Sequence, residues 1–566
     1  MAWVVPSRPP ASLSPIQYHL FMISAATFRV LFPALALLFG GFAPADLWAA
    51  TGLAAGRIDV RDCGVIGDGK TLNTGLINQA VAELSQAGGG TLVFGPGTYL
   101  TGTIYLQSMV TLQIDAGATI LGSTNIADYP ENSSPRPTSR LEYGRYALIS
   151  ATGQHDVAII GPGRIHGQGD HANFTKKYLL ARGWSPEDAY LKRPFGLSFV
   201  GCQRVTVQGI KLENLAFWCQ GYLDCNDVTV RGVTVDSKKH DYNNDGIDLD
   251  GCRNVRVSDC YFNVGDDAIC LKASYRDCEN ITITNCIASS LANGVKFGTA
   301  SNAGFKNIAV SNIVLNGVSA AGIALEIVDG GAMDGVSLSN FAMRNVGTAI
   351  FIRLGHNARQ WTTGPGKPGI GSLRNVSISQ VVAELWSEDD RPLSGSITGL
   401  PGHPVENVSI SDVRITARRA FSPERSRVDF RMVPEAAADY PEYSMFGPLP
   451  AYGLYVRHVR GLTLRNVQFS FTEMDYRSAI VCDKVDHLTI DGLQVRSLAA
   501  SAPVLFFHDV REALITGASL RDEVPVFLQI EGRSEGIQLL SNALAPAHQS
   551  MTSSDPTAKS NNSSGR

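Results

Sequence analysis

The sequence has no segment in which basic residues are interleaved with aromatic residues. Its 48 lysines and arginines are nearly balanced by 52 aspartates and glutamates, for a formal net charge of -4, so we expect no nucleic-acid partner. A long amphipathic helical pattern is nearly absent, and the sequence contains neither a CxxC pair nor a metal-ligand spacing of histidines. Structural zinc is therefore not expected, and we predict that the protein uses no metal and no cofactor.

The first fifty residues differ from the rest of the chain. An apolar run over residues 30–44 follows Arg29, and Asp46 ends it after about 16 residues, fewer than the roughly 20 that span a bilayer as a helix. Small residues at Ala49 and Ala50 follow, as at a signal-peptide cleavage site. We expect residues 1–50 to be a signal peptide, with Met22 a possible start, and the mature protein to be secreted or periplasmic without stable membrane insertion. A retained membrane anchor is the alternative.

A short phrase repeats along the chain from residue 202. Each copy combines one strand of period-2 alternation with a polar turn: CQRVTVQGI, CNDVTVRGV, CRNVRVSDC, CENITITNC, FKNIAVSNI, MDGVSLSNF, LRNVSISQV, VENVSISDV, VRGLTLRNV and VDHLTIDGL. Copies begin about 23 to 28 residues apart where nothing is inserted, a period typical of a solenoid. One strand cannot bury its apolar face alone, so the coils must stack about 4.8 Å apart. The prediction is an all-β, parallel β-helix.

Two residue types recur at fixed places in the repeat. Asparagine often precedes the apolar pair, as expected for a turn ladder, because asparagine tolerates the left-handed conformation and bonds to its neighbours above and below: Asn254, Asn280, Asn307, Asn375 and Asn407. Four of the ten cysteines also share one position: Cys202, Cys225, Cys252 and Cys278. Stacked free thiols are at least as consistent with this spacing as disulfides.

The ends and insertions of the solenoid are also predicted. Residues 74–87 have helical periodicity, with Asn73 or Thr74 as N-cap and Gly88 as stop, and this helix should cap the N-terminal end. We expect one β-helix domain over residues 57–540 and a disordered tail over residues 541–566. Insertions near residues 354–372, 386–404 and 416–452 are expected to wall a cleft, and we expect a monomer.

Carboxylates cluster on two consecutive repeats. NNDGIDLDG and VGDDAICLK, aligned with Ile247 over Ile269, place Asp245 over Asp267 and Asn244 over Asp266. A single Asp in a Gly-rich turn is usually structural, but stacked like charges are tolerated mainly where function requires shifted pKa values. Calcium binding is the competing use. Carboxylates on adjacent coils also suit an inverting glycosidase, whose acid and base lie about 6.5–9.5 Å apart.

NNDG followed by GDDAIC resembles the Asn-Thr-Asp and Gly-Asp-Asp motifs of glycoside hydrolase family 28, the polygalacturonase-like enzymes. DCGVIGDGKTLNT, GGGTLVFGPGTYLTGTIYL, IIGPGRIHGQG, RPFGLSFVGC and LENLAFW extend the resemblance over most of the chain. It implies a right-handed parallel β-helix that hydrolyses a pectic polysaccharide or oligosaccharide with inversion. By position it implies Asp266 as general acid, with Asp245 and Asp267 activating water.

The chain departs from that family where the substrate carboxylate is bound. Asn293 stands at a histidine position, and Glu326-Ile327-Val328 replaces Arg-Ile-Lys. A row of one residue per coil offers replacements, because it contains Asp250, Lys272, Gly298, Glu326 and Arg353. The predicted substrate-binding residues are Asn243, Lys272, Asn293, Lys296, Glu326 and Arg353, and we expect polygalacturonan to be a poor substrate because Glu326 would repel it. Trp218 is either a sugar platform or a core residue.

Two other functions remain open on the sequence alone. A β-helix polysaccharide lyase would abstract a proton with an Arg or Lys base and would often use calcium. A non-catalytic carbohydrate-binding β-helix is favoured only by the altered His and Arg/Lys positions. The three carboxylates and the motifs around them favour the hydrolase.

Overall fold

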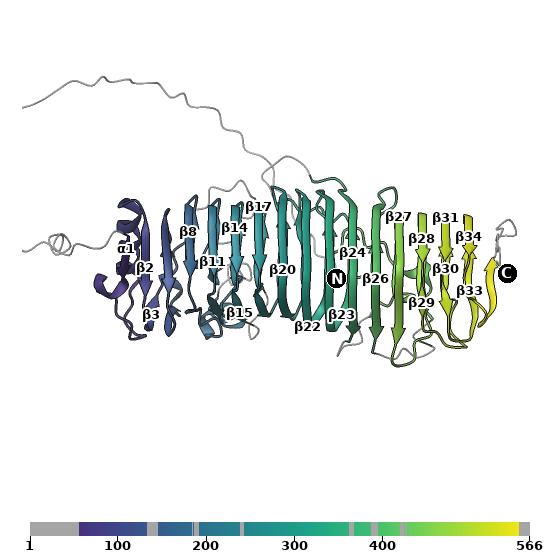
Figure 1. The fold of residues 1–566 in the computed structure, drawn as a ribbon. Helices are drawn as coiled ribbons and strands as arrows, with labels where there is room; N and C mark the ends of the chain where they lie inside the picture. Colours follow the sequence, from purple (N-terminus) through teal and green to yellow (C-terminus); the bar gives the residue numbers. More distant parts are fainter. Residues whose placement is uncertain are drawn as a thin grey trace, which may run out of the picture. The chain divides into compact units, whose positions relative to one another are not determined.

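A computed structural model describes residues 56–132, 145–183, 185, 192–237, 243–361, 367–386, 394–418, 424 and 427–553. The described residues belong to the compact unit Leu53–Arg566, and their strands stack in chain order (Figure 1). The predicted signal peptide over residues 1–50 lies outside the described residues. Among those described, no helix has the length and apolar character needed to cross a bilayer.

Every coil passes in turn through three parallel sheets, here called sheets I, II and III. Sheet I contains β1 (Arg57–Asp59), β2 (Gly90–Phe94), β5 (Val110–Ile114), β8 (His155–Ile160), β11 (Gln203–Gln208), β14 (Asn226–Arg231), β17 (Arg253–Ser258), β31 (Arg511–Thr516) and β34 (Glu535–Leu540). Sheet II contains β3 (Gly97–Thr101), β6 (Ala118–Gly122), β9 (Arg164–His166), β12 (Lys211–Glu213), β15 (Thr234–Ser237), β18 (Tyr261–Val264), β29 (Gln494–Val495) and β32 (Ser519–Leu520).

Sheet III positions the site described below. It contains β4 (Ile104–Tyr105), β7 (Ala147–Thr152), β10 (Phe195–Val200), β13 (Gln220–Leu223), β16 (Ile247–Asp250), β19 (Ile269–Ala273), β21 (Val295–Ser301), β25 (Gly395–Thr398), β30 (Leu505–His508), β33 (Val524–Glu531) and β35 (Ala547–Ser553). Longer strands bend from one sheet into the next: β20 (Cys278–Ser290), β22 (Phe305–Ile327), β23 (Ala332–Leu354), β24 (Ser372–Leu385), β26 (Val405–Ala417), β27 (Ala451–Phe471) and β28 (Ser478–Asp491).

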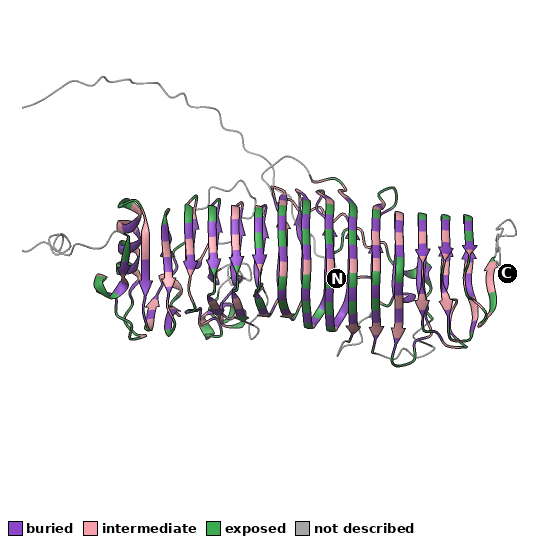
Figure 2. Cartoon of the chain, viewed as in Figure 1, coloured by how far each residue is buried: buried purple, intermediate pink, exposed green. Residues whose placement is uncertain are grey.

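The core is a set of ladders of aligned apolar residues. One ladder in sheet I runs, partner by partner, through Val255, Ile281, Ile308, Val336, Val376, Val408, Leu462 and Leu488, all at most 2% exposed. Alternate residues of these strands face solvent, so buried and exposed colours alternate along them in Figure 2. The period-2 pattern thus fixes which face of each strand is buried. This confirms the predicted parallel β-helix.

The asparagine ladder is present at a sharp turn. Asn254, Asn280 and Asn307 have φ of 56°, 58° and 52°, the left-handed region that asparagine tolerates. The amide of Asn280 donates to Asn254 at 3.2 Å, and that of Asn307 donates to Asn280 at 2.7 Å. The ladder therefore ties consecutive coils together outside the apolar core.

The N-terminal end is covered by α1 (Thr74–Gln86), as predicted. Its buried residues are Ile77, Ala80, Val81 and Leu84, whereas Leu76 is 41% exposed. Asn73 occupies the N-cap position but makes no side-chain cap; its carboxamide accepts from the backbone N–H of Ile66. The other helices are short: α2 (Lys176–Ala181), η2 (Val60–Cys63), η3 (Ile126–Asp128), η4 (Ala172–Phe174) and η5 (Phe430–Met432).

Two further expectations can be compared with the structure. All ten cysteines lie in described residues as free thiols, and the Sγ atoms of Cys225 and Cys252 donate to carbonyls of neighbouring coils. The expected disorder after residue 540 is wrong for Ala547–Ser553, because these residues form β35 against β33. Residues 554–566 lie outside the described part.

Candidate active site

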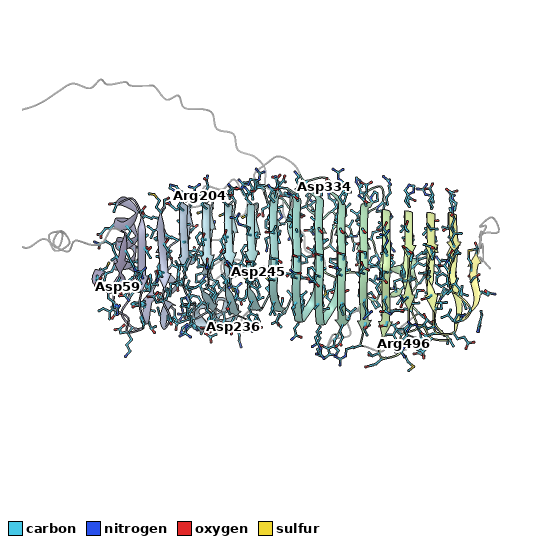
Figure 3. All side chains as sticks on the ribbon, in the orientation of Figure 1. Asp59, Arg204, Asp236, Asp245, Asp334 and Arg496 are labelled. Carbon is cyan, nitrogen blue, oxygen red and sulfur yellow. The ribbon has the colours of Figure 1, made fainter. Side chains whose placement is uncertain are left out.

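The predicted register brings the three aspartates together. Ile247 in β16 pairs with Ile269 in β19, and the N–H of Gly246 donates to the carbonyl of Asp267 at 2.9 Å. Asp245, Asp266 and Asp267 each place one carboxylate oxygen within 4.8 Å of the others. Figure 3 shows Asp245 in the N-terminal half of the stack. The cluster therefore arises from two coils in register, as the alignment of the repeats predicted.

Backbone and side-chain donors fix two of these carboxylates. Asp266 accepts from the N–H of Asn243 at 2.7 Å and from the N–H of Asp267 at 3.0 Å. Asp267 accepts from the Asn293 side chain at 2.8 Å and lies 3.1 Å from Lys296 Nζ. Asn293, which stands at the family's histidine position, thus holds the carboxylate of Asp267. The backbone N–H of Asn243 orients the carboxylate of Asp266.

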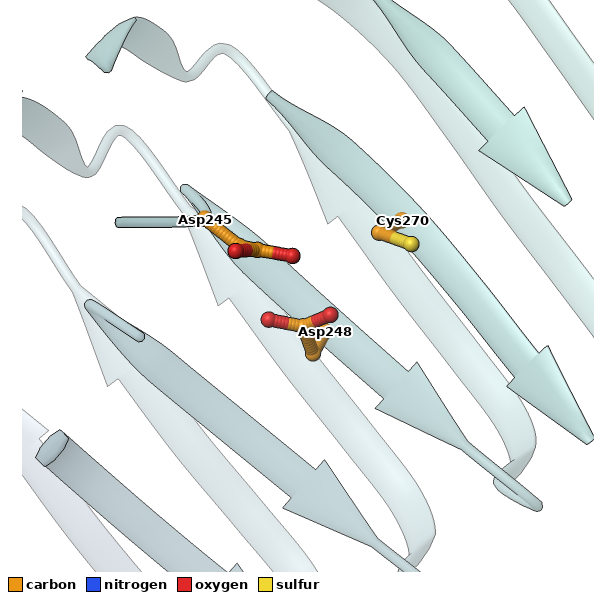
Figure 4. Close-up of side chains that lie close together, drawn as sticks. All are labelled: Asp245, Asp248 and Cys270. Atoms are coloured by element: carbon orange, nitrogen blue, oxygen red, sulfur yellow. The ribbon is translucent and has the colours of Figure 1, made fainter. Parts of the chain in front are cut away.

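A fourth carboxylate, Asp248, was not among the predicted site residues. It is fully buried on β16 and contacts Lys272 Nζ, which also lies 3.4 Å from Asp245 and 2.9 Å from the thiol of Cys270. Figure 4 shows Asp245, Asp248 and Cys270 side by side on adjacent strands. Asp248 follows Asp245 by three residues in the same motif and is the first outward position of β16, so this outward position was the available signal. Burial raises the pKa of Asp248 to about 7 against the opposing effect of Lys272.

Burial and charge move the pKa values of the cluster in different directions. Desolvation raises the pKa of Asp266, and the nearby charge of Asp267 adds to this. Desolvation also raises the pKa of Asp245 well above its ordinary value, with Asp248 adding to this effect. At Asp267 desolvation is the largest single influence and acts upward, but Lys296, Lys272 and Asn293 together outweigh it and lower the pKa. The arrangement therefore moves the pKa values of two adjacent carboxyls apart, the kind of separation that acid–base catalysis uses.

These groups line a cleft of about 260 Å³. Its walls include Trp218, Asn243, Asp245, Asp250, Asp266, Asp267, Lys272, Ser274, Lys296, Gly298, Thr299, Ala300, Arg359, Trp361 and Tyr440. Trp218 is 3% exposed, packs on Phe195 and Phe217, and has Lys272 Nζ 4.3 Å from its ring centroid. It is therefore a core residue with one edge in the cleft wall, where it fixes the lysine.

Two of the predicted insertions do wall the cleft. Arg359 and Trp361 follow β23, and both contact the buried Asp329, at 3.2 Å from Arg359 Nη2 and 2.8 Å from the Trp361 indole nitrogen. Tyr440, from the insertion before β27, accepts from Thr299 Oγ1 at 3.0 Å. The insertion near residues 386–404 contributes none of the residues that line the cleft, and residues 387–393 lie outside the described part. Sequence reasoning located the loops but missed these three side chains, because loop residues carry no register.

The predicted charged row exists, but two of its members do not face the cleft. Glu326 pairs with Arg353 in register, as expected, yet Glu326 is 1% exposed beneath Gly298. Burial raises the pKa of Glu326 to about 8, although Lys296 opposes this. Within the described residues no ion pair joins Glu326 to Arg353. Glu326 is not among the residues that line the cleft, so the structure does not support its predicted role as a substrate ligand.

The structure also does not support the predicted role of Arg353 in substrate binding. It is 1% exposed, and its guanidinium donates to the carbonyls of Glu435 at 2.7 Å and Ala436 at 3.1 Å. Desolvation lowers the pKa of Arg353 to about 10. Its contacts hold the insertion before β27 onto sheet III, which gives Arg353 a structural role.

The donor set does not favour a resident metal ion. Asp245 belongs to two groups with metal-compatible spacing, one with Asp266 and Asp267 and one with Asp248 and Cys270. The ammonium of Lys272 contacts Asp245, Asp248 and the Cys270 thiol, where it supplies the positive charge that a cation would bring. Calcium prefers six to eight oxygen ligands, and an ammonium among these oxygens would repel it.

One geometric expectation is not met. The acid and base of an inverting glycosidase are typically about 6.5–9.5 Å apart, whereas oxygens of the three aspartates lie within 4.8 Å of one another. Carboxylate spacing alone therefore does not support inversion in this protein.

The fold is a parallel β-helix, and its clustered aspartates line a cleft on sheet III. The sequence model of glycosyl hydrolases family 28 matches residues 91–429, more than half of the chain. The chain belongs to this family and is a glycoside hydrolase.

Relatives and solved structures agree with this assignment. A probable polygalacturonase of Vitis vinifera is 27% identical over 388 residues, covering 65% of this chain and 76% of the relative. An exo-poly-alpha-D-galacturonosidase of Dickeya chrysanthemi is 25% identical, covering 53% of this chain and 57% of the relative. The family 28 exopolygalacturonase of Yersinia enterocolitica has the same fold, with a TM-score of 0.58 at 19% identity over 79% of each chain.

Proposed function

We propose that the protein hydrolyses galacturonan or a pectic oligosaccharide derived from it, with Asp266 as general acid and Asp267 as the base that activates water. The observation that carries this proposal is that two adjacent carboxyls line one cleft while Lys296 and the Asn293 amide contact Asp267, a difference in surroundings that moves their pKa values in opposite directions. Asp266 keeps a proton for the leaving oxygen, while Lys296 and Asn293 keep Asp267 ionised. Asp267 takes the proton of the attacking water. Asp245, whose pKa is raised, orients that water.

Net inversion remains compatible with the short spacing. A water molecule that forms hydrogen bonds of about 2.7–2.8 Å to two oxygens fits between carboxylates up to 4.8 Å apart when the bonds meet at an angle. We infer that Asp245 and Asp267 hold this water together. Proton NMR of the first product would show the inverted anomer, and the retained anomer would instead indicate attack by Asp267 itself.

Two cations that line the cleft, Arg359 and Lys296, support a uronic acid as substrate. Arg359 lines the cleft and contacts Asp329 through Nε and Nη2, which leaves Nη1 for a ligand carboxylate. Lys296 lines the same cleft. The earlier reason to expect poor activity on polygalacturonan was repulsion by Glu326, and the burial of Glu326 removes it. We therefore propose polygalacturonan as a substrate.

Closure of one end of the cleft supports attack at a chain end. Beyond β21 the segment 435–440 crosses sheet III, where Ala437 accepts from the N–H of His356 and Arg353 donates to Glu435. We infer that this segment limits how far a polymer extends along the sheet. Several relatives are named exo-acting enzymes, which agrees with this inference.

One experiment tests these proposals together. The full-length protein is incubated with polygalacturonate, and products are resolved over time. We expect galacturonate monomer or dimer from the first time point and no ultraviolet absorption from an unsaturated product. Unsaturated products would establish a lyase, an early ladder of long oligomers would contradict chain-end attack, and no release of reducing sugar would favour the non-catalytic binder.

We also propose that residues 1–50 direct export and are removed, as their composition suggests. Sequencing the N-terminus of protein recovered from the medium or periplasm tests this, and an intact first segment would favour a membrane anchor.

A further inference from the structure

A second cavity lies on sheet III and shares no lining residue with the catalytic cleft. Its volume is about 600 Å³, within the range of about 300–1,000 Å³ typical of ligand sites. It is lined by residues 427–431, Pro450, Tyr476, Ser478, Val481, residues 500–503, Phe506, Gln529 and Glu531. None of these residues has a role in the proposed chemistry.

This distal cavity lies on the same face of the solenoid as the catalytic carboxylates. The outward row that contains Lys296 continues, partner by partner, through Ala324, Phe351, Ser396, Tyr455, Val481 and Phe506. Six strand spacings of about 4.8 Å separate Lys296 from Phe506, or about 29 Å. The insertion before β27 walls both sites, with Tyr440 in the cleft and Phe430 in the distal cavity.

The chemistry of the lining indicates a neutral ligand with hydroxyl groups. Its two arginines, Arg427 and Arg431, are balanced by Asp429 and Glu531. Arg431 Nη2 lies 2.7 Å from Glu531, and the Gln529 amide donates to Glu531 at 2.8 Å. These paired groups offer hydrogen bonds in several directions without an excess of either charge, which suits hydroxyls better than a carboxylate or phosphate.

Aromatic rings and a buried hydroxyl complete the site. Phe506 and Phe430 lie 5.0 Å apart between ring centroids, and Tyr476 lines the same cavity. The C–H face of a sugar ring packs on such apolar surfaces while its hydroxyls reach the polar rim. Ser501 is 8% exposed, and among the described residues its Oγ has no hydrogen-bond partner. A buried hydroxyl without a partner is unfavourable in the free protein, and a ligand hydroxyl would satisfy it.

We propose that the distal cavity is a non-catalytic binding site for neutral sugars of a polysaccharide, which holds the enzyme on branched pectic material. The cavity binds a neutral pyranose or furanose segment on Phe506, with Gln529, Glu531 and Ser501 bonded to its hydroxyls. The inference depends on the family of the chain and not on the assignment of acid and base.

Affinity electrophoresis tests the site in the full-length protein, run as the native enzyme and as the Asp266→Asn variant, with retardation by the neutral polymers as the readout in both. Gels contain neutral galactan, arabinan or polygalacturonate. We expect a neutral polymer to retard the protein, and Phe506→Ala or Gln529→Ala to weaken this binding about tenfold, equivalent to about 1.4 kcal/mol. Tyr105→Ala, which removes another exposed aromatic residue of sheet III, is the matched control and should bind as its parent does.

Ser501→Ala separates binding from structure. If the hydroxyl serves a ligand, Ser501→Ala weakens neutral-sugar binding without lowering thermal stability, and in the otherwise native enzyme it leaves kcat on a short galacturonate oligomer unchanged. The proposal fails if no neutral polymer retards the protein, if the cavity variants bind like their parent, or if only polygalacturonate binds. Failure of hydrolysis with intact retardation would instead overturn the proposed function alone.

Discussion

Two buried charge clusters lie on the same sheet of this molecule and differ in their balance. Around Asp245, four carboxylates (Asp245, Asp248, Asp266 and Asp267) face two ammonium groups (Lys272 and Lys296). Six coils of sheet III separate Lys272 from Asp483, which contacts Arg457 Nε at 3.0 Å and His508 Nδ1 at 2.9 Å. Arg457 also donates to the carbonyls of Val433 and Phe430.

The comparison shows that buried charge alone does not identify a catalytic site. The Asp483 cluster matches each charge with donors and ties an insertion to the sheet, whereas the Asp245 cluster keeps more carboxylates than cations and opens to a cleft. Burial raises the pKa values of Asp245 and Asp266, and the unmatched like charge of the neighbouring carboxylates adds to this; such excess charge is tolerated mainly at functional sites.

The largest expected effect separates the clusters by activity. Asp266→Asn should lower kcat about 10²–10⁴-fold, the range typical of lost general acid catalysis, with little change in thermal stability. Asp259→Asn, in the exposed turn between β17 and β18 of the same coil, is the control and should retain activity. Near-native turnover of a natural glycoside by Asp266→Asn would show that another group is the acid.

The second change separates the clusters by stability. Asp483→Asn removes the closest counterion of the buried Arg457 and leaves only Glu435, 3.6 Å away, and breaking a buried pair is expected to lower the free energy of unfolding by up to about 3–5 kcal/mol. Urea unfolding measures the loss, and kcat below the unfolding transition should stay unchanged. A loss of kcat comparable to that of Asp266→Asn would mean that the Asp483 cluster also serves catalysis.

Removing a cation from the catalytic cluster should shift the pH profile. Lys296→Met takes away the positive charge 3.1 Å from Asp267, and loss of a close opposite charge raises a carboxyl pKa by about 1–3 units. Since Asp267 must be ionised to act as base, the acidic limb of kcat should move to higher pH. Lys306→Met, which removes an exposed partner of Asp277, should leave the limb in place. An unmoved limb in Lys296→Met would exclude Asp267 as the titrating base.

The buried Glu326 predicts a pH-dependent stability. Its pKa in the folded protein is about 8, above the usual value of about 4.3 in an unfolded chain. The folded state therefore holds a proton that the unfolded state has lost, so stability falls as pH rises between these two values. At pH 5 the melting temperature of Glu326→Gln should be near that of the native protein. At about pH 9 the variant should melt at a higher temperature, because its free energy of unfolding should exceed that of the native protein by a few kcal/mol at most. Equal melting shifts at both pH values would contradict the buried, protonated state.

The smallest expected effect concerns metal ions. Because the ammonium of Lys272 already occupies the space between Asp245 and Asp248, treatment with EDTA should leave the rate of hydrolysis unchanged. Recovery of lost activity by added calcium would overturn this prediction and restore the lyase as a candidate.

Sequence periodicity was sufficient for the fold and for most of the carboxylate cluster, because both depend on register. Ile247 over Ile269 fixed Asp245 near Asp267, and the turn asparagines were found by the same spacing. Arg359, Trp361 and Tyr440 were missed because an insertion has no register from which a position can be inferred. Glu326 and Arg353 were placed in the correct row, but whether a row is open or covered depends on a loop more than 80 residues away in sequence from Arg353. Periodicity therefore predicts adjacency but not exposure.

The insertions that supply the cleft walls leave the solenoid undisturbed on either side. Ala332 at the start of β23 pairs with Ser372 at the start of β24, although residues 355–371 intervene, and the next coil continues from β26 to β27 across residues 418–450 with its pairing intact. Recognition and scaffold are thus physically separable parts. In a lineage of such proteins, the loops can be exchanged or lengthened while the ladders remain, so a change of preferred sugar requires no redesign of the core. The same separation makes these two segments natural units for grafting onto another β-helix.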